Sequence, residues 1–374
     1  MDKDDRKAAF RLLRGSGGGR SALWVRVLDI LLPLLCAFGI GSIFSLICHC
    51  NPFTLYGYII RKAFTTRAGI FNTLGYATPI IMTGIATALS IRANVYNMGI
   101  EGQVYVGAFA SALAGSMITA GSPVFRIVLC FLIAMTAGML YAAIPGILKA
   151  KLRINEVVTT IMLNNIATRT FAFLINGYLG AGDSYAHTPN IAMDIRLPRL
   201  DSKYRVTIAL FIALAIWAVL FFVIRRSKLG FEVDCVGKQW EFSDAVGMHV
   251  SRKIFLIFLI GGAVAGIAGA SEILGVNYNY TDGFSANPGV GWDGFYVCLL
   301  SGGSPIGILI LSIVFGALRY GALSAQTGLG VPLDLINVIK SSLILFIAIR
   351  LFSNNLPAIR SFFARRHSGK EAAR

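Results

Sequence analysis

Long apolar runs separated by short polar segments dominate this chain and restrict its fold more than any motif does. All but one of these runs approach the roughly 20 residues that a helix needs to cross a bilayer. About ten can be distinguished, at 27–47, 70–91, 104–120, 124–148, 157–179, 206–224, 254–274, 289–301 (the short one), 305–323 and 333–352. The sequence therefore predicts an all-α fold, a polytopic integral membrane bundle of about ten transmembrane helices.

Composition agrees with a membrane protein and argues against a nucleic-acid-binding one. The 374 residues are 56% hydrophobic and only 14% charged, which is outside the range of soluble globular domains. The net charge is +16, but the basic residues lie mostly between and beyond the apolar runs. The positive-inside rule accounts for that placement without a nucleic-acid partner.

Topology follows from the placement of Lys and Arg. With the N-terminus inside, the inner segments contain many more basic residues than the outer ones, so both termini are predicted to be cytoplasmic. We expect a basic flexible tail at 1–26, a transmembrane domain at 27–352 with an uncleaved first span, and a second basic tail at 353–374. Segment 51–69 is moderately apolar with interspersed basic residues, which suits an interfacial helix on the outer face.

A polar turn interrupts the apolar runs between Ile91 and Ala110, and it contains Asn97, Glu101 and Gln103. Such side chains cost several kcal/mol at membrane depth unless they face protein or water. The turn therefore indicates a lined pathway or a packed helix junction. The alternative is a cytoplasmic loop followed by a carboxylate at a helix start.

A second polar cluster opens the predicted span at 157–179. Its members carry amide or carboxylate groups, and they are Asn155, Glu156, Asn164 and Asn165. Helical spacing places several of these groups on one sector of a helix, where they can bind a polar solute or neighbouring helices.

The longest inner loop, 225–253, combines charges with three aromatic residues. We predict a short helix at 243–248 that is opened by Ser243 as N-cap, and a docking surface for a soluble partner. Later in the chain, small residues at Gly262 and Gly266, and at Ala265 and Gly269, predict tight helix packing, with a subunit interface as one possibility.

Signals for metal binding and enzymatic chemistry are weak. Cys48, His49 and Cys50 lack the partners of a metal site, and the four His residues are isolated. Around Lys238, a phosphate-binding loop would need glycine where Glu232 stands and Ser or Thr where Gln239 stands. We therefore expect that the chain cannot hydrolyse ATP alone.

Three segments carry a resemblance to a known family. NMGIEGQVYVGA at 97–108 is similar to the N-[IM]-G-x-E-G-Q signature of permease subunits of ATP-binding-cassette importers for nucleosides and simple sugars, in the superfamily of ribose and branched-chain amino acid permeases. NEVVTTIMLNNIA at 155–167 resembles the family's N-E-V-x-x-T-I-M-L-N segment, and GVGWDG at 289–294 resembles its G-x-G-[FW]-D-G segment. The match runs in order over most of 51–352.

The resemblance implies partners and further candidate residues. The permease would pair with itself or with a shorter related permease, with cytoplasmic ATP-binding subunits and with an extracytoplasmic substrate-binding lipoprotein. ATP and Mg would lie on the ATP-binding subunits, so no cofactor, metal or catalytic residue is expected in this chain. The resemblance adds Trp292 and Asp293 to the pathway candidates. The inner loop departs from the family's R-A-[VI]-G-x-N-x-x-A-A pattern in places, and the candidate coupling residues there are Gly237, Ser243, Asp244, Ala245 and Gly247.

We therefore expect a permease that moves a nucleoside, most specifically a purine nucleoside, across the cytoplasmic membrane. A simple sugar of the ribose or galactose type is the alternative substrate. A secondary transporter would belong to a different class and would need a coupling-ion site. The charged residues within the spans, Glu101, Glu272 and Arg319, do not form an evident relay.

Overall fold

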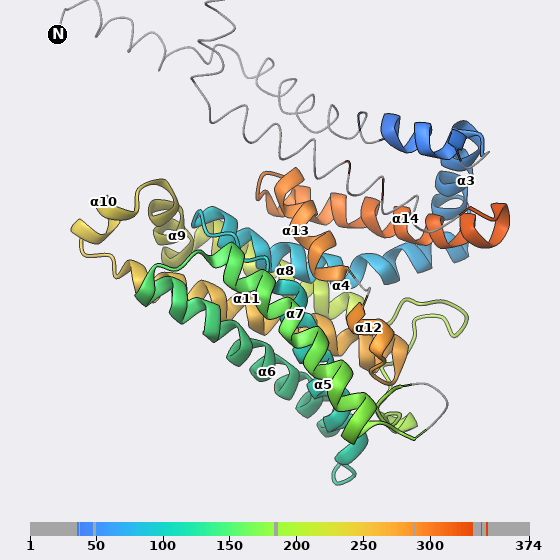
Figure 1. The fold of residues 1–374 in the computed structure, drawn as a ribbon, viewed down its shortest axis with the longest axis horizontal. Helices are drawn as coiled ribbons and strands as arrows, with labels where there is room; N and C mark the ends of the chain where they lie inside the picture. The colour runs from blue at the N-terminus through green and yellow to red at the C-terminus, as the bar shows by residue number, and fades with distance from the viewer. Residues whose placement is uncertain are drawn as a thin grey trace, which may run out of the picture. The chain divides into compact units, whose positions relative to one another are not determined.

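The computed structural model describes residues 36, 38–47, 50–182, 186–286, 289–331, 338 and 342. The chain divides into two units, and the unit Tyr56–Gly328 contains the sites described below. The described residues form helices and connecting segments, with isolated β-bridges at His187–Thr281 and Arg199–Thr207 (Figure 1). This confirms the all-α prediction for the described part of the chain.

Among the described residues, six helical segments are long and apolar enough to cross a membrane. They are α4 (Arg67–Arg92), α6 (Pro123–Leu152), α7 (Glu156–Leu174) with its π-helical end η1 (Ile175–Leu179), α8 (Ala209–Arg226), α11 (Val250–Glu272) with η3 (Ile273–Asn277), and α14 (Pro305–Leu329). Each coincides with a predicted span. The other labelled α-helices are α3 (Pro52–Phe64), α5 (Ile100–Met117), α9 (Lys228–Lys238), α10 (Trp240–Ala245), α12 (Asp282–Ala286) and α13 (Val290–Leu300).

These six helical segments do not test the predicted total of about ten spans. The span predicted at 104–120 corresponds to α5, which is not among the six, and the one at 289–301 corresponds to the short α13. The predicted span 333–352, most of 27–47 and both basic tails lie outside the described residues. Helix α3 lies within the segment predicted to be an interfacial helix.

Helix boundaries follow local capping chemistry. Thr66 caps α4 by accepting a hydrogen bond from Gly69 N at 2.9 Å. Asn155 caps α7 in the same way, since its Oδ1 accepts from Val157 N at 2.9 Å. These side-chain oxygens satisfy backbone donors that the first helical turn leaves free.

Helices α5, α6 and α11 pack through glycine at backbone contact. A Cβ added at Gly266 would collide with the carbonyl of Ala134 in α6, and one added at Gly269 would lie 2.6 Å from Ala108 N in α5. Gly138 and Gly262 face each other in the same manner. The predicted tight packing is confirmed, and its partners are helices of the same chain.

Helix α13 begins beside the middle of α4. Thr83 of α4 donates to the carbonyl of Val290 at 3.0 Å, and a Cβ at Gly294 would lie 2.7 Å from Gly84 N. With 11 residues, α13 is about 16 Å long, roughly half the thickness of a bilayer core. If α4 crosses the membrane, α13 is a half-helix whose N-terminus lies inside the bilayer.

Candidate functional site

The first and third signature segments meet at the N-terminus of α13. Glu101, in the first turn of α5, is buried, and its Oε2 accepts hydrogen bonds from Gly291 N at 2.5 Å and from Trp292 N at 3.1 Å. Its Oε1 accepts a third from the Tyr105 hydroxyl at 2.6 Å. Helix starts carry partial positive charge and free N–H groups, so a carboxylate is well suited to this position. Glu101 thus caps a helix that lies 190 residues away in the sequence.

The second signature segment is attached to the same junction through Asn164 of α7. Its Oδ1 accepts from Gly102 N at 2.9 Å, and its Nδ2 donates to the Met98 carbonyl at 2.8 Å. The Asn164 amide therefore joins α7 to the start of α5 through one accepted and one donated hydrogen bond, both with backbone groups. Asn165 lies on the other side of α7, is exposed, and donates to its own helix at Ile161 O, 3.1 Å away.

Glu156 and Asn155 have different surroundings at the start of α7. Glu156 is buried, pairs with Lys149 of α6 at 2.6 Å, and accepts from Tyr96 N at 3.3 Å. Asn155 is exposed and serves as the N-cap described above. Glu156 thus fastens the ends of α6 and α7 to the turn before α5.

Asn97 and Gln103 are buried within the polar turn. Asn97 Oδ1 accepts from Gly99 N at 3.0 Å and from Gln103 Nε2 at 3.5 Å. Within the described part of the chain, Asn97 Nδ2 and Gln103 Oε1 have no hydrogen-bond partner. Buried polar atoms of this kind are uncommon and costly, so they mark a place where the interior is not optimised for stability.

The third segment supplies an ion pair and an aromatic pair. Asp293 is buried, and its Oδ2 lies 3.5 Å from Nη1 of Arg319 in α14. Trp292 is half-buried and stacks on Tyr296 with a centroid distance of 6.0 Å. No partner for Arg319 was evident from the sequence. In the structure, Asp293 of the same chain balances its charge.

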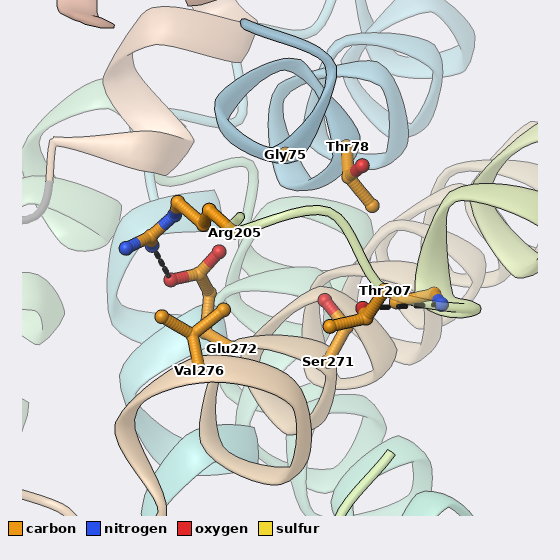
Figure 2. Close-up of a pocket in the computed structure, with 8 residues that line it drawn as sticks. Gly75, Thr78, Arg205, Thr207, Ser271, Glu272 and Val276 are labelled. Carbon is orange, nitrogen blue, oxygen red and sulfur yellow. Dashed lines mark hydrogen bonds and ion pairs between the residues drawn. The ribbon is translucent and has the colours of Figure 1, made fainter. Parts of the chain in front are cut away.

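A further ion pair was not predicted from the sequence. Arg205, in the segment before α8, pairs with buried Glu272 of α11 (Figure 2). The Arg205 guanidinium also lies 4.3 Å from the ring centroid of Tyr76. Thr78, Thr207 and Ser271 line a cavity of about 10 Å³ beside this pair, room for about one water molecule. Glu272 itself could have indicated this ion pair from the sequence, because an acid inside an apolar span requires a partner.

Aromatic rings cover the junction on the side of Tyr105. Phe109 of α5 stacks on Phe171 of α7 at 4.4 Å, and Tyr280 contacts both rings at 5.4 and 5.8 Å. Phe284 of α12 joins Tyr280 at 5.3 Å and Tyr105 at 6.1 Å. These rings link α5, α7 and α12 to the segment that follows η3.

The inner loop folds into α9 and α10. Gly237 lies against the backbone of Arg92, and Asp234 accepts two hydrogen bonds from Arg92 Nη1, each 3.1 Å long. The predicted helix at 243–248 with Ser243 as N-cap is wrong. The extended backbone of Gln239 (φ −157°, ψ 99°) starts α10 at Trp240, and Ser243 is buried within that helix.

The remaining coupling candidates lie on the surface of this loop. Asp244, Ala245 and Gly247 are exposed, and so are the apolar side chains of Phe242 (61%) and Val246 (58%). Gly247 has a φ of +85°, a conformation that other residues adopt with strain. The loop therefore presents exposed apolar and charged side chains, and it is anchored to α4.

Comparison with known proteins identifies the family. Residues 69–348 match the family described as branched-chain amino acid transport system, permease component. The chain is 32% identical over 329 residues to the guanosine ABC transporter permease protein NupP of Bacillus subtilis, covering 86% of this chain and 94% of that protein. It is 29% identical to the nucleoside ABC transporter permease protein NupB of Lactococcus lactis (93% and 98% covered) and 28% identical to the glucose ABC transporter permease protein TsgB13 of Haloferax volcanii (87% of each).

No solved structure was found to match the chain. The family match covers far more than half of the sequence and includes all three signature segments. The six apolar helices agree with a multi-pass membrane protein. This chain belongs to the permease family of ABC transporters, and it is a transport subunit rather than an enzyme.

Proposed function

We propose that this permease forms part of an importer that moves nucleosides, in particular purine nucleosides, across the cytoplasmic membrane. The supporting observation is the similarity along almost the whole chain to relatives named for guanosine and for nucleosides. A simple sugar is the second candidate, favoured by the glucose-named relative at 28% identity. In this proposal the chain has about ten spans and both termini in the cytoplasm.

The partners in this proposal are those of an ABC importer. Two cytoplasmic ATP-binding subunits hold ATP and Mg, an extracytoplasmic lipoprotein delivers the solute, and a second permease, identical or shorter and related, completes the pathway. The candidate pathway residues divide into two groups. The buried group braces the junction and the adjoining helix ends, and it comprises Asn97, Glu101, Gln103, Glu156, Asn164 and Asp293. The group that retains exposed surface comprises Asn155, Asn165 and Trp292.

The coupling contact in this proposal is the α9–α10 loop. The exposed apolar side chains of Phe242 and Val246 fit a pocket on an ATP-binding subunit, and Ala245 lies between them in sequence. In this proposal a movement of the loop is transmitted to α4 through Gly237 and Asp234, because both residues contact Arg92 at the C-terminal end of α4. Buried Ser243 keeps α10 in place rather than meeting the partner.

Uptake measurements test the substrate assignment. The chain and its partner subunits are expressed in cells that lack other nucleoside uptake, and radiolabelled guanosine, adenosine, ribose and glucose are compared. We expect nucleoside uptake that requires this chain, and competition by unlabelled purine nucleosides but not by the sugars. Uptake restricted to ribose or glucose would replace the nucleoside assignment by the sugar alternative.

A further inference from the structure

Arg169 is a charged residue of α7 that the junction around α13 does not use. Its side chain is exposed, and neither an ion pair nor a hydrogen bond connects its guanidinium to any other described residue. Along α7 and η1 it lies about 20 Å from Glu156 and about 15 Å from Leu179 at 1.5 Å per residue. An arginine side chain cannot bridge the longer distance, and the shorter one exceeds its reach of about 6 Å. Arg169 therefore lies at membrane depth.

Two amides share the side of α7 on which Arg169 lies. Asn165 precedes it by four residues and Asn176 follows by seven, spacings that place all three on one helical face. Each amide donates to its own helix, Asn165 to Ile161 O at 3.1 Å and Asn176 to Ala172 O at 2.7 Å. All three side chains are exposed. We call Asn165, Arg169 and Asn176 the polar stripe of α7.

The opposite side of α7 faces the bundle. Thr160, Asn164, Ala167 and Phe171 are buried, and Asn164 and Phe171 contact α5 as described above. The polar stripe lies on the outward face of α7, and the inward face of this helix is already occupied. The outward face also carries exposed apolar side chains, among them Met162 (60%), Ile166 (52%) and Phe173 (63%).

Lipid does not suit this stripe. The outward face of α6 shows what a lipid-facing helix in this chain looks like, since Val128 (50%), Leu132 (47%) and Leu140 (71%) are exposed and apolar. A guanidinium facing acyl chains has no hydrogen-bond acceptors and is strongly disfavoured.

A second copy of the chain offers no acidic partner at that depth. Among the described residues, the acids within the apolar helices and α5 and α13 are Glu101, Glu156, Glu272 and Asp293, and all four are buried and paired within their own chain. Water satisfies a guanidinium and two amide oxygens together.

We propose that the polar stripe of α7 lines the water-filled translocation pathway and offers hydrogen bonds to the passing solute. The guanidinium provides planar paired donors, and the Asn165 and Asn176 Oδ1 atoms provide acceptors. This set suits a neutral polar solute rich in hydroxyl and ring-nitrogen groups. The match to a nucleoside rests on the function proposed above, whereas the exposure of the stripe to water does not.

Cysteine labelling tests the exposure to water. Asn165→Cys and Arg169→Cys are treated with a membrane-impermeant maleimide in intact cells and in inside-out vesicles, with the parent chain giving the background of its native cysteines. We expect both positions to be labelled from at least one side and Leu140→Cys, on the apolar face of α6, to remain at background. Background labelling at both stripe positions from both sides would overturn the proposal.

Two further experiments separate this inference from the substrate assignment. Guanosine, supplied with the delivering lipoprotein and ATP, should slow labelling at Arg169→Cys severalfold. If the position is labelled but nucleosides never slow it, the pathway role stands and the nucleoside assignment falls. Arg169→Leu should reduce uptake at least tenfold at normal abundance, with partial recovery in Arg169→Lys. Full uptake with unchanged or higher abundance in Arg169→Leu would show a lipid-facing arginine and refute the pathway role.

Discussion

Replacing Glu101 tests whether its carboxylate holds α13 in place. In Glu101→Ala, the N–H groups of Gly291 and Trp292 lose their acceptor, and neither can turn toward another because both belong to a helix backbone. Each buried unsatisfied donor costs about 1–3 kcal/mol, so the two together cost about 2–6 kcal/mol. Loss of the favourable interaction between the carboxylate and the helix N-terminus adds up to about 2 kcal/mol.

Matched variants separate the capping role from the loss of a side chain. Glu101→Gln keeps an acceptor oxygen at the same place and should cost only about 1–2 kcal/mol. Tyr105→Phe removes the third hydrogen bond, 2.6 Å long, and should cost about 1 kcal/mol. Glu241→Ala alters an exposed carboxylate of α10 and should leave stability unchanged.

Thermal unfolding of the purified permease in detergent, followed by size-exclusion chromatography, measures the ranking. We expect the alanine variant to lose monodisperse protein at a much lower temperature than the glutamine variant, which should stay close to the parent. Uptake per folded molecule should fall in both, because α13 supplies Trp292 and Asp293. A Glu101→Ala protein as heat-resistant as Glu241→Ala would refute the capping interpretation.

Three further predictions concern packing, ion pairing and coupling. Gly266→Val should sharply reduce folded protein, because its Cβ has no room against Ala134, whereas Gly57→Ala, where a Cβ meets nothing within 4 Å, should not; yields after detergent extraction decide this. Glu272→Leu should destabilise by about 3–5 kcal/mol by leaving Arg205 unpaired, and Arg205→Leu combined with it should recover much of the loss; equal melting of single and double variants would contradict the pairing. Ala245→Arg should leave the permease folded but abolish co-purification with the ATP-binding subunit and solute-stimulated ATP hydrolysis, since a charge enters a packed contact; Lys228→Ala, at an exposed position of α9, is the control. Ala245 is a better test site than Gly247, whose positive φ adds backbone strain to any substitution.

Apolar periodicity and motif content predicted the helical class, the six long helices and the segments that form the junction. The partners of the polar residues were not predictable, because they depend on contacts between distant parts of the chain. Glu101 caps α13 across 190 residues, and nothing near either segment indicates that pairing. Asn164 and Asn165 are adjacent and chemically identical, yet one binds α5 and the other faces outward. Ser243 has the right chemistry for an N-cap, but the backbone of Gln239 begins the helix earlier.

The bare contact between the backbones of α5, α6 and α11 has a mechanical consequence. Helices that touch through glycine have no flexible side chains between them to absorb a sliding movement, so they shift together or not at all. Glu101 adds α13 to this group through N–H groups that have no rotamers. We therefore expect these four helices to move as one unit. We also expect any movement that opens a passage to occur at the edge of this unit, where α7 is held by rotatable groups, the amide of Asn164 and the ring of Phe171.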